Sequence, residues 1–436
     1  MERSPLLLLG AAAALGAAAA QPLSPELRLL TLCGCIALCA WIALSRARFG
    51  RLRAFAALAL VAGWASGFLH ARASVESFPG RTTRFACTVL DDGATQNDFS
   101  AFTCAADDGT KLAVATRAGP PRVGTRVLLR GRIEPFDLPR NPGEPNQRLI
   151  ERERGFAGHV SSAQILRTLP SAPLTLDVAL ARAHAWALVE LRARLPEPSA
   201  TILAGELWGE RASLPPELRA EFQETGTVHV LVTAGLHLGV VAAIVLLLLR
   251  GLTTPRACAC AIAIAVIWSY AVFSGFHLPA VRAATMISFA LAAYAFGRAT
   301  RAWNVFGAAM LAIALFEPEA VQSASFALSF SCVGAILLCA DCIDKGLERY
   351  GALPARLREV LALTIATQIG TWPLTAAIFL LFAPYALLAN AAVVPCVGVT
   401  MILGAAQLAL AWAPPLAQAV ANVNGWLLAW IVASVH

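Results

Sequence analysis

The sequence predicts a membrane-embedded, all-α helical bundle that carries one small β-barrel domain on the outer side of the membrane. Apolar residues make up 58% of the 436 residues and charged residues only 14%, whereas soluble domains carry about a quarter charged residues. The apolar residues gather into runs close to the roughly 20 residues with which a helix crosses a bilayer. These runs lack the apolar–polar alternation of a membrane barrel, so we expect helices.

About ten or eleven membrane helices are expected from these runs. The first run ends in Ala18, Ala19 and Ala20, which resemble a cleavage site, so it is either a signal peptide or a retained helix. Pro395 lies inside a late run and could split it. The runs lie at residues 5–20, 27–45, 54–70, 228–249, 257–274, 280–297, 303–316, 321–340, 359–382, 385–411 and 418–436.

The arginines between the runs predict the orientation of the chain. Cytoplasmic loops carry an excess of Lys and Arg, and residues 46–53 contain four arginines between the second and third runs. That loop is therefore expected in the cytoplasm, which places residues 71–227 outside. The later basic loops alternate consistently with a multi-pass protein of the cell inner membrane. Arg282 is the exception, because it falls near the outer end of a run.

Residues 78–168 have the pattern of a small β domain. Expected strands are 82–90, 98–105, 111–116, 125–134 and 156–166, separated by turn sequences such as Asn141-Pro142-Gly143. Five short strands with a longer insertion before the fifth fit an OB-like Greek-key barrel, and an SH3-like barrel fits the pattern as well.

The chain is therefore expected to contain four parts. Residues 1–70 are N-terminal membrane helices, and 71–170 are the extracytoplasmic OB-like β domain. Residues 171–227 are predicted to form amphipathic and surface helices, with a plain linker as the alternative for 196–227. Residues 228–436 form the multi-helix membrane domain.

Four ordered segments resemble those of the ComEC family of competence proteins, and the likeness extends over nearly the whole chain. Ala234 and Ala327 depart from it, because the family usually has Ser and Gln there. The segments are Phe222–Gly239, Phe273–Ala283, Ser325–Phe330, and the pair Gln368–Pro373 with Leu388–Pro395.

The resemblance implies a channel that conducts single-stranded DNA into the cytoplasm during natural transformation. The implied partners are single-stranded DNA, membrane lipid, other competence proteins and a second copy of the chain. The sequence has no Gly-Lys-Ser/Thr nucleotide-binding motif, so a separate protein would supply the motor. Many family members also carry a metallo-β-lactamase-like domain, whose His-x-His-x-Asp-His ligand set this sequence lacks. The sequence is therefore either a fragment or the transport portion alone, and a nuclease is considered among the partners.

Polar and small residues in the apolar runs are candidate pore or core residues, because polar side chains are costly in a membrane. His229 and His237 are eight residues apart without the Glu of a zinc-binding helix motif, which favours a pore-lining, helix-bridging or core role over a metal site. Gly235 and Gly239 have the spacing that lets two helices approach closely.

Arg282, Gln368, Asn390 and Pro395 complete the candidates in the membrane part. Arg282 could contact phosphate through its forked donors or extend towards the lipid headgroups. Asn390 with Pro395 could mark a broken helix that lines a cavity, or an ordinary turn between two helices.

The candidate DNA-binding residues of the β domain are Arg126, Arg130 and Arg132. They alternate along one expected strand and so share a face. With Phe99, Phe102, Phe136 or Phe156 they could form the charged, stacking surface that single strands need, although most of these aromatic residues are expected in the core.

Cys87 and Cys104 lie on adjacent expected strands of the same domain. Strand alternation could bring them within bridging distance, and the outer compartment is oxidising. We therefore consider a disulfide between them.

The sequence contains no complete catalytic constellation, so neither enzymatic activity nor a cofactor is expected. A small-molecule secondary transporter is one alternative, but it leaves the β domain unexplained. A membrane-bound metal-dependent enzyme that uses His229 or His237 is another, and a scaffold of an envelope complex is a third.

Overall fold

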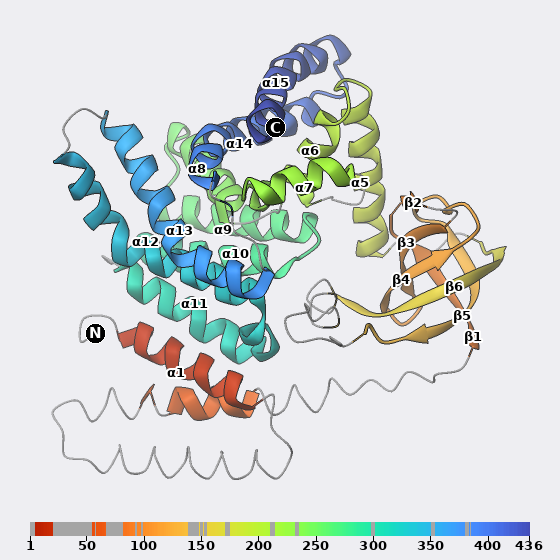
Figure 1. The fold of residues 1–436 in the computed structure, drawn as a ribbon, viewed down its shortest axis with the longest axis horizontal. Helices are drawn as coiled ribbons and strands as arrows, with labels where there is room; N and C mark the ends of the chain where they lie inside the picture. The colour runs from red at the N-terminus through yellow and green to blue at the C-terminus, as the bar shows by residue number, and fades with distance from the viewer. Residues whose placement is uncertain are drawn as a thin grey trace. The chain divides into compact units, whose positions relative to one another are not determined.

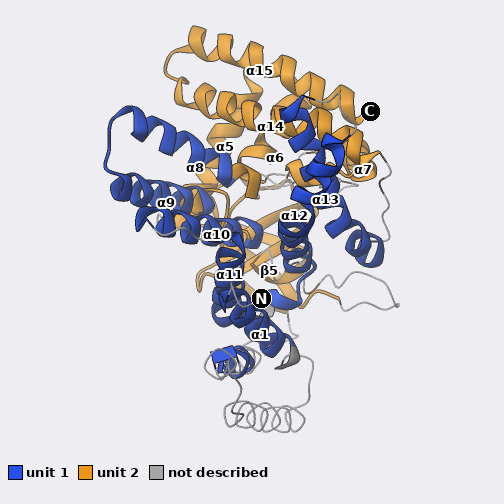
Figure 2. Cartoon of the chain, turned by 90° about the vertical axis from the view of Figure 1, so that its left-hand side faces the viewer, with its two compact units in different colours: residues 1–76, 238–271, 278–380 blue, residues 77–237, 272–277, 381–436 orange. Residues whose placement is uncertain are grey.

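The computed structural model describes residues 5–20, 55–66 without 57, 82–91, 94–96, 99–137, 148, 151, 155–170, 175–209, 214–231, 235–297, 301–349, 354–379, 383 and 385–436. The predicted span 27–45, the arginine-rich loop 46–53 and the Asn141–Gly143 turn lie outside these residues. The chain forms two compact units (Figure 2). Unit 1 contains residues 1–76, 238–271 and 278–380, and unit 2 contains 77–237, 272–277 and 381–436.

The β domain of unit 2 is a closed barrel (Figure 1). Its sheet order is β1-β5-β6-β4-β3-β2, and an additional β1–β3 pairing closes five strands, with β2 added to β3. The β4–β6 pair is parallel, whereas the other pairs are antiparallel. This is the connectivity of an OB-like Greek-key barrel. The strands are β1 Thr82–Val89, β2 Ala94–Gln96, β3 Phe99–Ala106, β4 Lys111–Thr116, β5 Arg126–Glu134 and β6 Phe156–Thr168.

The sequence pattern predicted the five barrel strands within two residues at every end. Alternation is the reason: on β5, Val127 and Leu129 point into the core whereas Arg130 and Arg132 are exposed. The three-residue β2 was missed because it is too short to alternate. The barrel core is Cys87, Val89, Phe102, Cys104, Leu112, Val114, Val127, Leu129, Val160 and Ala163.

Unit 2 also contains a group of helices. Helix α5 begins where the Thr175 side chain accepts a hydrogen bond from the Val178 amide. All ten residues of α6 are buried against other parts of the protein, so this segment of the predicted 171–227 region is a packed helix. The elements are α5 Leu176–Arg192, α6 Ser199–Trp208, α7 Pro216–Glu224, the 3₁₀ helix η1 Val228–Leu231, α14 Ala386–Ala409 and α15 Pro414–Val435.

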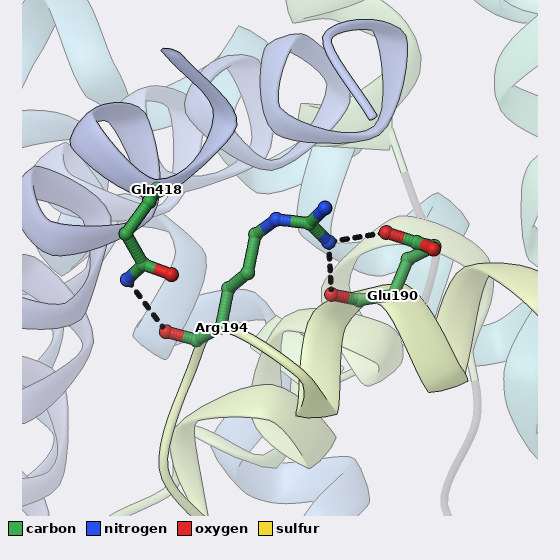
Figure 3. Close-up of polar contacts among 3 residues, drawn as sticks. All are labelled: Glu190, Arg194 and Gln418. Carbon is green, nitrogen blue, oxygen red and sulfur yellow. Dashed lines mark hydrogen bonds and ion pairs between the residues drawn. The ribbon is translucent and has the colours of Figure 1, made fainter. Parts of the chain in front are cut away.

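Helix α5 is fixed at both ends within unit 2. At its start, Asp177 forms an ion pair with Lys111 of the barrel at 2.9 Å. Just beyond its end, Arg194 contacts the Glu190 side chain and donates to the Glu190 carbonyl at 3.1 Å. The Arg194 carbonyl accepts from Nε2 of Gln418 on α15 at 3.3 Å (Figure 3). Helix α5 therefore connects the barrel with α15.

Unit 1 consists of helices. Helix α1 packs along α11 (Figure 1) so closely that a Cβ added at Gly10 would lie 2.1 Å from the Gly307 carbonyl oxygen. Phe306, Phe326 and Phe330 continue this core. The elements are α1 Pro5–Ala20, α8 Gly235–Gly251, α9 Arg256–Phe273, α10 Leu278–Ala295, α11 Ala302–Phe316, the 3₁₀ helix η2 Pro318–Gln322, α12 Ala324–Glu348 and α13 Ala355–Phe379; the first residues of α8 and the last of α9 belong to unit 2.

Six helices of the described chain, α9, α10, α12, α13, α14 and α15, are long and apolar enough to cross a membrane. Helices α1, α8 and α11 are apolar but shorter. Helix α8 begins later than the predicted span 228–249 because residues 228–231 form η1.

Helix α14 is continuous through Pro395. The predicted broken helix at Asn390 and Pro395 is therefore wrong, and so is an ordinary turn there. A proline removes one backbone donor, and a bundle can compensate through neighbouring groups. The carbonyl freed by Pro395 is that of Ala391, and the Trp430 indole of α15 donates to the neighbouring Ala392 carbonyl at 3.3 Å.

Candidate functional site

The four sequence segments that resemble the competence family meet one another in pairs inside each unit. In unit 1, Arg282 of α10 is only 2% exposed. Its Nη2 donates to the Ser325 carbonyl at 3.0 Å and to the Ser325 Oγ at 2.6 Å. Ser323 caps α12 by accepting from the Phe326 amide at 2.9 Å, which fixes the turn that carries Ser325. The second and third segments are thus joined by an arginine.

The buried position of Arg282 corrects the expectations for it. A side chain at an exposed pore mouth would contact phosphate, and one at the membrane surface would extend into the headgroups. The observed guanidinium does neither, because it lies inside unit 1 between α10 and α12. Arg282 thus bridges α10 and α12 through Ser325.

The fourth segment meets α12 through a glycine. A Cβ added at Gly370 of α13 would lie 2.6 Å from the Ser331 carbonyl oxygen and 2.7 Å from the Ala335 Cβ. The neighbouring candidate Gln368 is half-buried. Gly370 is therefore the residue that lets α13 approach α12 closely. The sequence analysis chose Gln368 as the candidate because it is polar, and it did not choose Gly370.

In unit 2, the first segment meets the start of α14. Gly226 has a φ of 67°, and an added Cβ would lie 2.9 Å from the Ala386 Cβ. Asn390, one turn further along α14, is 7% exposed, and its Oδ1 has no hydrogen-bond partner among the described residues. Asn390 is thus a buried polar residue, whereas Gly226 makes the contact between the segments.

The two candidate histidines differ in exposure. His229 is exposed, and its Nδ1 lies 3.1 Å from the Gly226 carbonyl oxygen. His237, in the first turn of α8, is 1% exposed. Among the described residues no three His, Cys, Asp or Glu side chains are grouped to hold a metal.

Gly235 and Gly239 do not form the predicted close helix contact. Gly235 is exposed, and a Cβ added at Gly239 would meet nothing within 4 Å. The spacing rule applies to any two small residues one turn apart. Among the described residues, an added Cβ would meet the backbone of another helix at Gly10, Gly16, Gly63, Gly307 and Gly370 instead.

The segment that begins at Phe273 is held by an aromatic cluster that the sequence did not indicate. His184 of α5 stacks on Trp208 of α6, with ring centroids 5.3 Å apart. Its Nε2 lies 2.7 Å from the Phe273 carbonyl oxygen. Burial lowers the pKa of His184, so the neutral ring donates to that carbonyl. The following turn has positive φ values at Gly275 and Phe276.

The barrel arginines share an outward face, as predicted, but they are not equivalent. Arg126 pairs with Asp107 at 2.5 Å, and Arg132 pairs with Glu134 at 3.0 Å. Arg130 is exposed and lies directly opposite Arg84 of β1. Within the described residues these last two form no ion pair. Arg84 was missed because nothing in its local pattern gives the register of β1 against β5.

The aromatic candidates divide between core and surface. Phe102 is buried in the barrel core at 3% exposure. Phe136 is half-buried and packs against His159, with ring centroids 5.3 Å apart. Phe156 is likewise half-buried, and the side chain of Phe99 lies outside the described part of the chain. Phe136 and Phe156 are therefore the described candidates with ring surface that a base could reach.

The two barrel cysteines are free thiols in the structure. The register pairs Cys104 with Val89 and Cys87 with Ala106, so the cysteines are diagonal rather than directly opposite. The thiols contact each other, and this contact and burial raise the pKa of Cys104. The considered disulfide is therefore not formed here, although the residues are neighbours.

The fold defines a class: a multi-pass helical membrane protein with an inserted OB-like barrel. Residues 207–436, more than half of the chain, match the family described as competence protein. The chain belongs to the competence protein family.

Two relatives match a smaller part of the chain. Competence protein ComA of Neisseria gonorrhoeae is 30% identical over 166 residues, which cover 36% of this chain and 24% of ComA. The uncharacterized protein YcaI of Escherichia coli (strain K12) is 30% identical over 161 residues, which cover 33% of this chain and 20% of YcaI. The matches thus span under a third of each relative's length. None of the solved structures gives a significant match.

Proposed function

We propose that the chain is the membrane part of a DNA-uptake machine and conducts single-stranded DNA across the inner membrane. The observation that carries the proposal is membership of the competence protein family over residues 207–436. The competence name of a relative supports the same process. A closed OB-like barrel adds a module that commonly binds oligonucleotides.

The proposed point of first contact is the barrel face with Arg84 and Arg130. Binding of single strands combines a positively charged surface with aromatic side chains on which bases stack. Arg84 and Arg130 are adjacent across two strands, and Phe136 supplies an aromatic ring on the same domain. The barrel would lie on the outer side of the membrane, where the strand arrives.

Complementation tests the proposed function directly. A strain that lacks its own copy of this gene should regain transformation by externally added DNA when this chain is expressed in it. Growth and membrane insertion of the chain are the controls. Normal insertion without any recovered transformation would contradict the proposal for this chain alone.

The outer location of the barrel has a separate test. A cysteine introduced at Thr110, a half-buried residue next to the exposed turn 107–109, should react with a membrane-impermeant thiol reagent in intact spheroplasts, because the barrel would face outwards. The matched control is a cysteine at Arg349, which follows α12 and is expected in the cytoplasm. Labelling at Arg349 but not at Thr110 before lysis would reverse the orientation.

A further inference from the structure

A glutamate without solvent contact lies among the helices of unit 2. Glu206 is 0% exposed, on a helix whose every residue is buried. Helix α6 packs against α5, α14, α15 and η1. An isolated carboxylate is very costly in such surroundings unless it is neutralised. Glu206 therefore requires a positive ligand or a proton.

The hydrogen bonds of Thr400 indicate how Glu206 is neutralised. Glu206 Oε2 lies 2.7 Å from Thr400 Oγ1. The same hydroxyl lies 2.9 Å from the Val397 carbonyl oxygen and 3.2 Å from that of Cys396. A hydroxyl has one proton, and helical threonines usually donate it to such carbonyls. When Thr400 does so, its oxygen accepts from Glu206, which must then carry a proton.

A second buried polar side chain converges on Thr400 from α15. Asn424 is 0% exposed, and its Nδ2 donates to the Thr400 carbonyl at 3.1 Å. Within the part of the chain that the structure describes, its Oδ1 and the Oε1 of Glu206 both lack a hydrogen-bond partner. Buried polar atoms are nearly always paired. The two described side chains bonded to Thr400 thus each leave one oxygen unpaired, and oxygen ligands suit a small hard cation.

In the described elements packed against α6, no charged side chain pairs with Glu206. Helix α15 has no titratable side chain, and α14 contributes only Cys396. On η1, His229 is exposed and contacts Gly226. Burial raises the pKa of Glu206 to about 8. Three charged groups of α5 have ion-pair partners elsewhere: Asp177 pairs with Lys111, Glu190 with Arg194 and Arg192 with Glu197. The other two titratable groups of α5 contact other residues, because Arg182 lies over Gly124 and His184 stacks on Trp208.

We propose that Glu206, Thr400 and Asn424 form a binding site for one small monovalent cation, a proton or a sodium ion. One such cation makes the site neutral, which is the state that a buried, unpaired carboxylate requires. The site goes beyond DNA conduction, because it would make the packing of α6, α14 and α15 depend on a cation.

The test uses the full chain in lipid nanodiscs and compares wild type with Glu206→Gln, which keeps the shape and removes the charge. A carboxyl with a raised pKa binds its proton more tightly in the folded state, so stability falls as pH rises from about 4.5 to about 8 and then levels. The wild-type Tm should fall over that window relative to Glu206→Gln. The exposed Glu224→Gln is the control and should follow wild type.

The identity of the cation, proton or sodium, is determined above about pH 8. There the Tm in sodium chloride is compared with the Tm in choline chloride at equal ionic strength. A higher wild-type Tm in sodium, absent in Glu206→Gln, identifies a sodium site. The pH effect without a sodium effect identifies a proton site. Identical pH and sodium responses of the two proteins overturn the proposal.

A second variant keeps the test decisive if Glu206→Gln does not fold. Thr400→Val retains the carboxyl and the side-chain shape but removes the bonded hydroxyl. It should change the pH window or lose the sodium effect, whereas unchanged responses overturn the proposed site. The pH dependence and the sodium dependence of the Tm are both measured without DNA uptake. The cation site can therefore be confirmed or overturned even if the proposed DNA-uptake function fails its own test.

Discussion

Among the described residues, each unit contains one buried side chain of an Arg, Lys, Asp or Glu, and the two differ in how they are neutralised and bonded. Arg282 in unit 1 is bonded through the same nitrogen to the carbonyl and hydroxyl of Ser325. Glu206 in unit 2 has one bonded oxygen and one without a partner. An arginine stays charged at every relevant pH, whereas a carboxyl can lose its charge. Unit 1 thus holds a permanent charge and unit 2 a variable one.

The largest expected effect of any change is at Arg282. Arg282→Glu places a carboxylate against the Ser325 carbonyl, and disruption of such a buried charge costs about 3–5 kcal/mol. We expect a strong loss of folded protein, measured as Tm and as yield of monodisperse protein. Arg349→Glu, at an exposed position, is the control. Equal Tm values for both variants would show that Arg282 is not a structural bridge.

The second largest effect is expected at Gly370, and it tests how tightly α13 packs against α12 in unit 1. Gly370→Ala forces a Cβ against the Ser331 carbonyl and should cost about 1–3 kcal/mol. Gly239→Ala meets nothing within 4 Å and should gain up to about 1 kcal/mol of helix propensity. Chemical unfolding of the two variants measures both signs. If Gly239→Ala is destabilised instead, the result would support the close helix contact at Gly239 that the sequence predicted.

A comparable test in unit 2 concerns Gly226. Gly226 and Gly297 share a φ of 67°, but only Gly226 has a close neighbour. Both alanine variants should lose about 1–2 kcal/mol from the left-handed conformation, and Gly226→Ala should lose about 1 kcal/mol more through Ala386. If Gly226→Ala and Gly297→Ala lose the same unfolding free energy, Gly226 does not make a close contact with the start of α14.

The smallest effect concerns the barrel arginines. For the full chain binding a single-stranded oligonucleotide, Arg84→Ala and Arg130→Ala should each lower the salt slope of log K by about 0.7. Arg126→Ala is the control, because Arg126 already pairs with Asp107, and it should change the slope less. Fluorescence anisotropy at several salt concentrations measures this. Unchanged slopes for all three variants would exclude this face from binding.

The sequence predicted the barrel better than the contacts within the membrane helices. Strand alternation and turn residues are local signals, so they gave the five strands and the outward face of Arg130. Helix contacts depend on which faces meet, and that information is not local. Gly370 and Ser325 therefore escaped selection, whereas Gly239 and Gln368 were chosen on spacing and polarity. Arg84 needed a register, and Glu206 looked like part of a surface segment.

The two attachments of α5 have a mechanical consequence. Asp177 connects its start to the barrel through Lys111, and the carbonyl of Arg194 connects its end to Gln418 of α15 (Figure 3). A helix is stiff over 17 residues, so it transmits displacement along its length instead of absorbing it. A pull on the barrel by a bound strand would therefore reach α15 unless one of these two attachments broke first.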